Sequence, residues 1–435
     1  MTSSRRVASH RRFSWRSLRR AVVAVVTLGS LFEAVIGPPP ARADAPVPAA
    51  STPLSVGAGA EPSDAARTPE LRHFYDALAA LARHQRNESV RVLWLGDSHT
   101  ASDFLTGAVR SRLVERYGSG GPGFLRLGVP VRHDLATFER SGRFRIQPES
   151  PATRLHQDDG VFGFGGMRVT PLSDGARLGV RLAPRSVRGR AKFTLLYDVK
   201  LGGEFAMRLG STAVNVRGTE GAQRVAGSPV LRRSIEGEPS EPFSVEVRRG
   251  RPRFYGLFVD GSEPGVVVDT VGINGARVAT ALAWAEAPFA AEVLAREPEL
   301  VVMAFGTNEA FDELRVSAYE AQLAQLLRRL RQRPNVDCLV LGPPDALAPS
   351  GEPAARVAEI TRVYASSART LGCAFVSAQA LMGGPGAFAS WQRQDPQLAS
   401  ADRVHLTPKG YRKLGELVFD ALFAGAAPAE ATNAP

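Results

Sequence analysis

Hydrophobic and polar positions follow two patterns that alternate through the C-terminal half of the chain. Short apolar runs are separated by longer stretches in which apolar residues recur every three or four positions. The first pattern predicts buried strands and the second predicts amphipathic helices. The predicted strands are 266–271, 300–305, 336–341 and 373–376, and the predicted helices are 277–296, 317–332, 354–371 and 408–423. Continuous apolar strands that alternate with helices indicate an α/β fold with a parallel sheet covered on both faces.

A similar unit occurs near the start of the chain. Thr68 and Pro69 suit the cap and first position of a helix, and the apolar run 90–95 predicts a strand that ends at Gly96. A second helix is expected over about 103–116. Between this unit and the rest lies a long interruption, 118–264, in which apolar and polar residues alternate with a period of two. That period is typical of half-buried antiparallel strands, and the segment is too long for a loop. We therefore expect an inserted β-sandwich there.

The N-terminal segment contributes most of the net charge. The chain has 435 residues and a formal net charge of +11, and eight arginines with a single acid lie within residues 1–43. A basic start, an apolar stretch over 21–37 and the small-x-small site at 41–43 predict a cleaved signal peptide and export to the periplasm or envelope. Glu33 interrupts the apolar stretch, so an uncleaved anchor is the alternative. The remaining chain is only mildly basic, which argues against nucleic-acid binding.

Two further segments and the two cysteines complete the organisation. Residues 44–66 and 425–435 are rich in Ala and Pro, and we expect a flexible linker and a flexible tail. Cys338 and Cys373 each open a predicted strand. They could pair in an oxidising compartment, but we favour two unpaired buried residues.

Candidate reactive groups follow two predicted strands or precede the last helix. Ser98 follows the strand 90–95, Asn308 follows the strand 300–305, and Asp402 and His405 precede the helix 408–423. A serine hydroxyl becomes a nucleophile only when a base removes its proton. A carboxylate three residues before an imidazole can hold its Nδ1, which leaves Nε2 free to act as that base. Each residue alone also fits a structural role as a cap or turn residue.

These residues together resemble the four sequence blocks of the SGNH, or GDSL-type, hydrolase family. The blocks are Gly96-Asp97-Ser98, Gly275, Gly306-x-Asn308 and Asp402-x-x-His405. The resemblance covers about 88–117 and 265–424, and it implies a three-layer α/β/α fold with a flavodoxin-like sheet. The domains would be a hydrolase domain in two parts, 67–117 and 265–424, interrupted by a carbohydrate-module-like insert at 118–264.

The resemblance also implies the roles of the site residues. Ser98 would be the nucleophile, His405 the base and Asp402 the group that orients it. The oxyanion hole would consist of the Ser98 N–H, the Gly275 N–H and the Asn308 side chain, with Gly272 as the alternative to Gly275. Two positions depart from the family pattern: His99 stands where Leu is usual, and Glu309 stands where Asp is usual. Neither has an assigned catalytic role.

The form Gly-Asp-Ser-His and the β-rich insert resemble members that act on O-acetylated carbohydrates. We therefore expect a serine esterase that removes acetyl groups from an envelope glycan such as peptidoglycan, with the O-acetylated glycan as its partner. No metal or cofactor is expected, and no membrane span is expected after signal cleavage. An O-acetyltransferase with the same triad, a lipase or thioesterase, and a non-catalytic glycan-binding protein are the alternatives. The sequence leaves the oligomeric state open.

Overall fold

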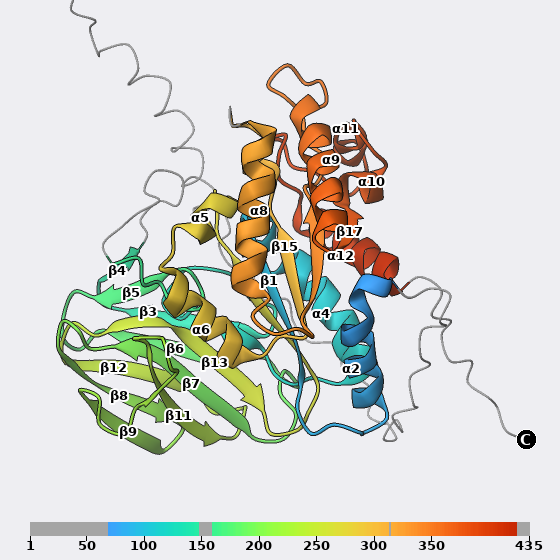
Figure 1. The fold of residues 1–435 in the computed structure, drawn as a ribbon. Coiled ribbons are helices and arrows are strands. Elements are labelled where there is room, and N and C mark those ends of the chain that lie inside the picture. The colour runs from blue at the N-terminus through green and yellow to red at the C-terminus, as the bar shows by residue number, and fades with distance from the viewer. Residues whose placement is uncertain (1–67, 148–158, 313–314, 424–435) are drawn as a thin grey trace, which may run out of the picture. The chain divides into compact units, whose positions relative to one another are not determined.

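The apolar runs that predict strands form a five-stranded parallel sheet. The computed structural model describes residues 68–147, 159–312 and 315–423 (Figure 1). The strands of this sheet are β1 (Val90–Gly96), β14 (Val266–Gly272), β15 (Leu300–Ala304), β16 (Asp337–Gly342) and β17 (Ala374–Ser377). Their order is β14-β1-β15-β16-β17, and every neighbouring pair is parallel. Counted along the chain this is the order 2-1-3-4-5, which is the flavodoxin-like order.

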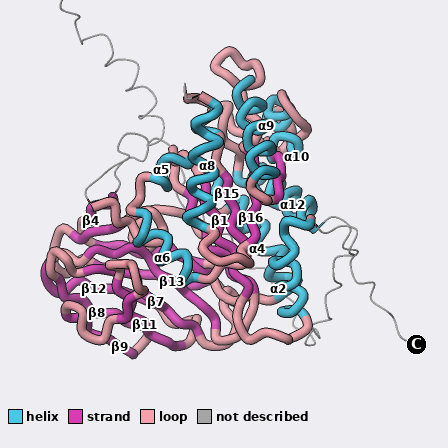
Figure 2. Tube along the Cα trace, viewed as in Figure 1, coloured by secondary structure: helices cyan, strands magenta, loops and turns pink. Residues whose placement is uncertain are grey.

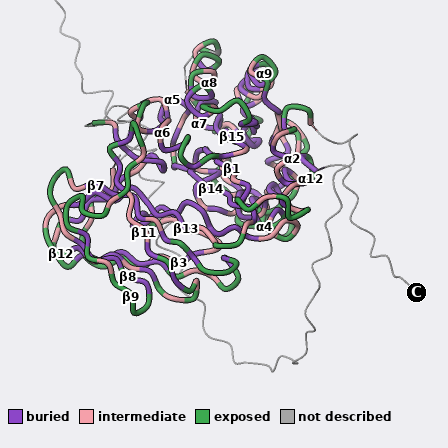
Figure 3. Tube along the Cα trace, turned by 60° about the horizontal axis from the view of Figure 1, so that its bottom comes forward, coloured by how far each residue is buried: buried purple, intermediate pink, exposed green. Residues whose placement is uncertain are grey.

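Helices cover both faces of the parallel sheet. They are α2 (Arg72–Ala82), α3 (Ser98–Ala101), α4 (Phe104–Tyr117), α5 (Val278–Leu282), α6 (Glu286–Arg296), α7 (Thr307–Ala310), α8 (Val316–Leu330), α9 (Ala355–Thr370), α10 (Ala378–Met382), α11 (Ala387–Gln392) and α12 (Pro408–Phe423). Because side chains alternate along a strand, Leu93 and Leu95 of β1 pack with α5, α6, α8 and α9, whereas Val92 and Trp94 pack with α2, α4 and α12. Figure 3 shows these central strands as buried.

Several predicted elements differ in detail. The helix expected over 277–296 is interrupted between α5 and α6, and the short helices α3, α7, α10 and α11 were not expected. Each of these four helices has six residues or fewer, which is too short for a helical period to be recognised in the sequence. Thr68 stands at the cap position of a short 3₁₀ helix (Pro69–Leu71), but its side chain makes no capping hydrogen bond.

Residues 123–261 contain two antiparallel sheets, seen as the strand-rich part in Figure 2. The larger has the order β10-β11-β7-β13-β5-β4, with β2 also paired to β13, and the smaller has the order β3-β6-β12-β8-β9. The strands are β2 (Gly123–Leu125), β3 (Ala136–Ser141), β4 (Phe144–Gln147), β5 (Arg168–Pro171), β6 (Arg177–Leu182), β7 (Ala191–Asp198), β8 (Gly203–Leu209), β9 (Thr212–Arg217), β10 (Gln223–Arg224), β11 (Leu231–Gly237), β12 (Phe243–Gly250) and β13 (Arg253–Gly261). Both sheets contribute side chains to one hydrophobic cluster, for example Phe193 and Phe243, whose rings stack. The inserted β-sandwich domain and the domain boundaries stay predictions.

A buried arginine joins the larger antiparallel sheet to the parallel sheet. Arg296, at the end of α6, donates hydrogen bonds to both oxygens of Asp260 on β13 and to both oxygens of Asp269 on β14. Asp269 also accepts the backbone N–H of Phe124 on β2 at 2.7 Å. Strands from both sheets and one helix are therefore tied to the same pair of carboxylates.

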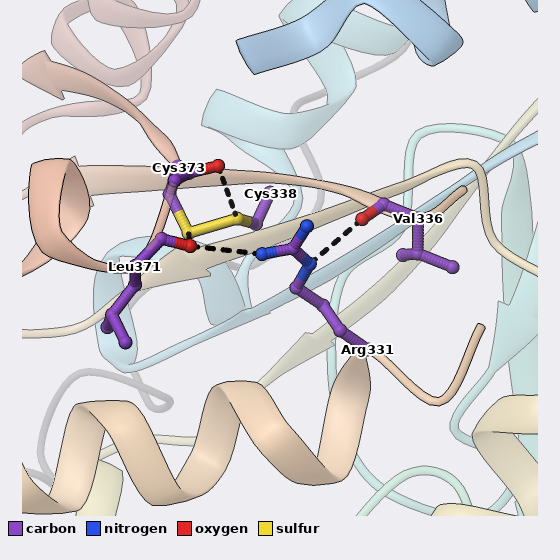
Figure 4. The surroundings of a disulfide bond; sticks show 6 residues. Arg331, Val336, Cys338, Leu371 and Cys373 are labelled. Carbon is purple, nitrogen blue, oxygen red and sulfur yellow. Dashed lines mark hydrogen bonds between the residues drawn. A yellow bond between two sulfur atoms is a disulfide. The ribbon is translucent and has the colours of Figure 1, made fainter. Parts of the chain in front are cut away.

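The two cysteines form a disulfide bond, so the favoured interpretation of two unpaired residues is wrong. Cys338 lies on β16 and Cys373 directly precedes β17, and the two Cα atoms are 4.8 Å apart. Adjacent parallel strands bring the two side chains together, which the sequence pattern did not reveal. Beside the bond, Arg331 donates hydrogen bonds to the carbonyl oxygens of Val336 and Leu371 (Figure 4). The guanidinium thus connects the segments that lead into both strands.

The expected signal peptide (1–43), linker (44–66) and tail (425–435) lie outside the described residues. Within the described ranges, none of the helices has the length and apolar character needed to cross a bilayer.

Candidate active site

Three neighbouring strands of the parallel sheet end side by side, and each leads into a segment that the sequence singled out. Gly96 at the end of β1 is paired with Gly272 of β14 on one side and with Ala304 of β15 on the other. The N–H of Ile273, which follows Gly272, donates to the Gly96 carbonyl at 3.1 Å. The strand order therefore places the segment that holds Ser98 between the segment of Gly275 and the segment of Asn308.

Ser98 is the first residue of α3, directly after a turn that requires glycine. A Cβ atom added at Gly96 would lie 2.1 Å from the Thr100 hydroxyl oxygen and 2.7 Å from the Ala304 carbonyl oxygen. Asp97 caps α3 by accepting the His99 N–H at 3.0 Å. As the first helical residue, Ser98 has an N–H that no intrahelical acceptor satisfies. The turn thus presents the Ser98 hydroxyl and its N–H at the same strand end.

His405 and Asp402 meet Ser98 from the turn before α12. The Ser98 Oγ lies 2.8 Å from His405 Nε2, and His405 Nδ1 lies 2.7 Å from Asp402 Oδ2. The other Asp402 oxygen accepts the backbone N–H groups of Val404 and His405 at 3.0 and 2.8 Å. These two bonds fix the carboxylate in the turn. The Nδ1 proton is held by Asp402, which leaves Nε2 as an acceptor for the serine proton.

The environment of Asp402 keeps it ionised. Partial burial acts to raise its pKa, but the hydrogen bonds from the His405 ring and from the His405 and Val404 N–H groups outweigh it and lower the pKa to about 2. Side chains of both His405 and Asp402 are about two-fifths exposed, so substrate and solvent can reach them. At neutral pH the imidazole therefore has a permanently charged partner.

The structure brings Asn308 and the segment of Gly275 together. Asn308, on α7, donates its side-chain N–H to the Ala276 carbonyl at 2.9 Å. Gly275 has a φ of +74°, and a Cβ atom there would have no neighbour within 4 Å. A Cβ at Gly272, in contrast, would lie 2.4 Å from the backbone nitrogen of Ala101. Close packing against α3 thus accounts for Gly272, whereas Gly275 stands in an open, partly exposed turn.

Glu309 has a positioning role that the sequence did not reveal. Its side chain is fully buried and accepts the Val278 N–H with one oxygen, at 2.9 Å, and the Gly306 N–H with the other, at 3.0 Å. Burial raises the pKa of Glu309 to about 7, although the bond from Val278 opposes the shift. This carboxyl group links the segment after β14 to the turn that carries Asn308. In the sequence, the only signal for Glu309 was its position directly after Asn308.

His99 contacts the last helix and lies beside the ring of His405. Its Nδ1 lies 2.9 Å from the Tyr411 hydroxyl on α12, and its ring centroid lies 5.4 Å from that of His405. Burial lowers the pKa of His99 to about 3, so the ring is neutral at physiological pH. His99 and Tyr411 are more than 300 positions apart, and no sequence pattern connects them.

Among the described residues, no group of three or more His, Cys, Asp or Glu side chains is arranged to hold a metal ion.

Comparison with known proteins identifies the class. The model of the GDSL-like lipase/acylhydrolase family matches residues 236–413, a range that includes Asn308, Asp402 and His405 but not Ser98. The chain therefore carries a GDSL-like lipase/acylhydrolase domain and is a serine ester hydrolase. The fold supplies the missing block, because β1 lies between β14 and β15 and brings Ser98 to His405. No curated protein sequence matches the chain.

Solved structures with a similar fold include a peptidoglycan O-acetylesterase. It is 23% identical, and the match covers 84% of this chain and 98% of the other, with a TM-score of 0.67. A variant of an acetylxylan esterase from Geobacillus stearothermophilus is 21% identical and covers 38% of this chain and 76% of its own, with a TM-score of 0.31. The protein TesA is 23% identical, and its match covers 37% of this chain and 78% of TesA, with a TM-score of 0.28. The first likeness extends through the antiparallel sheets, and so the whole described fold resembles that of the O-acetylesterase.

Proposed function

We propose that the protein is an exported serine esterase that removes O-acetyl groups from a cell-envelope polysaccharide related to peptidoglycan. The observation that carries the proposal is the continuous chain of hydrogen bonds from Ser98 through His405 to Asp402 at the edge where three strands end. This arrangement activates a hydroxyl without a metal or cofactor.

The reaction proceeds in two steps through an acetyl-serine. In the first, His405 Nε2 takes the Ser98 hydroxyl proton while Oγ attacks the acetyl carbonyl carbon. The tetrahedral intermediate collapses, the sugar oxygen leaves with the proton returned by His405, and the acetyl group stays on Ser98. In the second, His405 takes one proton from water, whose oxygen attacks the acetyl carbon. Acetic acid leaves as His405 returns the proton to Ser98 Oγ, and the acid then ionises to acetate in solution.

Three N–H groups stabilise the negative charge on the carbonyl oxygen in this proposal. They are the backbone N–H groups of Ser98 and Gly275 and the side-chain amide of Asn308. The Asn308 amide has two N–H groups and donates one of them to the Ala276 carbonyl oxygen. The second remains available for the oxyanion, and the bond to Ala276 holds the amide against the Gly275 turn.

The substrate and the location rest on further observations. The fold match to a peptidoglycan O-acetylesterase covers 84% of the chain and supports an acetylated glycan as substrate. The disulfide between Cys338 and Cys373 supports an oxidising compartment, as does the basic and apolar start of the sequence.

The direct test measures acetate release from O-acetylated peptidoglycan and, in parallel, from acetylated xylan. We expect the wild type to release acetate faster from peptidoglycan, and the Ser98→Ala and His405→Ala variants to release none above background. Equal rates for wild type and variants on both glycans would contradict the triad. A clear preference for xylan would contradict the envelope substrate.

The same assay separates the alternative functions. Acetyl groups that appear on an added glycan acceptor instead of as free acetate would indicate a transferase. Faster turnover of long-chain than of acetyl p-nitrophenyl esters would indicate a lipase or thioesterase. Retention on a glycan column without turnover would indicate a binding protein.

A further inference from the structure

A small cavity lies directly beneath the candidate active site. It has a volume of about 10 Å³, and its lining includes Asp97, His99 and Thr307 together with apolar side chains such as Leu105 and Phe305. A buried water needs a space of about this size and two to four polar partners. The cavity is therefore large enough for one water molecule and too small for a substrate.

Three of the residues that line the cavity each have a buried side-chain polar atom without a hydrogen-bond partner. These atoms are Asp97 Oδ2, His99 Nε2 and Thr307 Oγ1, and the three residues are only 1%, 6% and 3% exposed. A buried polar atom without a partner is destabilising, because it loses its hydrogen bonds to solvent and gains none in the protein. Three such atoms around one small space are best explained by a common partner.

The chemistry of the three atoms suits water. His99 is neutral because burial lowers its pKa to about 3. With the Tyr411 hydroxyl as donor to Nδ1, the ring proton lies on Nε2 and can be donated. A water oxygen accepts a hydrogen bond from Nε2–H, and the two O–H groups of the water can donate to Asp97 Oδ2 and Thr307 Oγ1. One molecule thus satisfies all three atoms.

We infer that a single structural water occupies this cavity and bridges Asp97, His99 and Thr307. Asp97 and His99 flank Ser98 in the sequence, and Thr307 directly precedes Asn308. The water therefore connects the turn of the nucleophile to the turn of the oxyanion amide. Its positioning effect, though not its presence, rests on the proposed function of Ser98 and Asn308.

A crystal structure at a resolution that shows ordered waters tests the site without any activity assay. We expect one peak about 2.6–3.2 Å from each of the three atoms. Absence of a peak, or closure of the cavity by a direct hydrogen bond from the Thr307 hydroxyl to Asp97 Oδ2, would overturn the inference. Retention of this peak in a Ser98→Ala protein that still hydrolyses esters would instead refute the proposed function alone.

Substitution of Thr307 tests the positioning effect. Thr307→Val keeps the shape but removes the hydroxyl, and we expect loss of the water peak and a kcat about tenfold lower on p-nitrophenyl acetate with an unchanged KM. Thr307→Ser keeps the hydroxyl and should restore kcat to within about twofold of wild type. Equal kcat for the Val variant and wild type, or equal losses for Val and Ser, would refute the positioning role.

Thr270→Val is the matched control. Thr270 lies on β14, is also buried, and has a hydroxyl without a partner, but it does not line the cavity. Its substitution should leave both the water peak and kcat unchanged. A loss of kcat equal to that of Thr307→Val would show that removal of any buried hydroxyl has this effect, and would overturn the bridging role.

Discussion

Buried and partly buried carboxyl groups have different partners in two regions of the molecule. Where the parallel sheet meets the antiparallel sheet, Asp260 and Asp269 share the guanidinium of Arg296. Burial opposes ionisation of Asp260, but Arg296 lowers its pKa. Near Ser98, Asp97 and Glu309 are almost fully buried, and no ion pair to either is found among the described residues. Burial raises the pKa of each to about 7.

The difference separates two uses of a buried charge. Around Arg296, complementary charges fix the contact between two sheets, and the guanidinium favours the ionised form of Asp260. Around Ser98, the carboxyl groups of Asp97 and Glu309 hold backbone N–H groups of the turns that carry Ser98 and Asn308, and both have a pKa near neutral pH. We expect substitutions in the first region to affect mainly stability, and substitutions in the second to affect turnover or its pH dependence.

The largest expected effect is on turnover by the Ser98→Ala variant. Without the nucleophile, kcat/KM for p-nitrophenyl acetate should fall by at least about 10³-fold, since removal of one triad member disables the whole unit. The melting temperature should stay close to that of wild type. Ser211→Ala, an exposed serine between β8 and β9, is the control and should retain full activity. Comparable activity of the two variants would contradict the assignment.

The next effect is on the stability of the Arg296→Met variant. Removal of the guanidinium leaves Asp260 and Asp269 buried without a cation, and the free energy of unfolding should fall by about 3–5 kcal/mol. Urea denaturation measures it. Arg181→Met removes an exposed ion pair with Glu139 and should change stability by less than about 1 kcal/mol. A similar small change for Arg296→Met would show that the buried contact does not hold the sheets together.

A moderate effect is expected for Glu309→Gln. Its amide retains one acceptor for two backbone N–H groups, which should reduce the free energy of unfolding by about 1–3 kcal/mol and also reduce kcat.

The same variant tests the pH dependence of stability. In the wild type, the folded-state pKa of Glu309, about 7, exceeds the ordinary 4.5, so the folded state binds the proton more tightly. The free energy of unfolding therefore falls as pH rises from about 5 to 7. The variant should show a smaller slope in urea midpoints over this range. Part of the slope remains because Asp97 shifts in the same direction. An unchanged slope would show that Glu309 does not titrate there.

The smallest effect concerns Asp402 at acid pH. Its folded-state pKa of about 2 lies below the ordinary 3.8, so it contributes stability above about pH 4 that is lost as pH falls toward 2. The group is partly exposed, and solvent screening keeps the effect small. Urea midpoints at pH 4.5 and pH 3 should differ less in Asp402→Asn than in the wild type. A larger difference in the variant would contradict the expected sign.

The sequence predicted the parallel sheet and singled out the side chains that meet at Ser98, because both are encoded locally. Apolar runs mark β1, β14, β15 and β16 within one or two residues. Asp402 and His405 lie three positions apart in one turn, so their contact depends on the turn alone. The meeting of Ser98 with His405 follows from the order of the strands, as the resemblance to SGNH hydrolases implied.

Contacts between distant segments could not be predicted in this way. Glu309 accepts a hydrogen bond from the Val278 N–H near a neighbouring strand end, and His99 is hydrogen-bonded to Tyr411 on the last helix. The disulfide depends on the adjacency of β16 and β17, which periodicity does not show. Each of these contacts depends on which elements become neighbours in space, whereas the periodicity of a single sequence reports only on each element separately.

The placement of β1 also has a consequence for biosynthesis. Both partners of β1 in the sheet, β14 and β15, are translated only after the twelve intervening strands. A nascent chain therefore carries β1 with two unsatisfied edges while the ribosome completes the antiparallel strands. Such edges readily pair with other chains, and contacts of this sequence separation form slowly. Aggregation during synthesis should thus depend more on the apolar run of β1 than on any later strand of the same sheet.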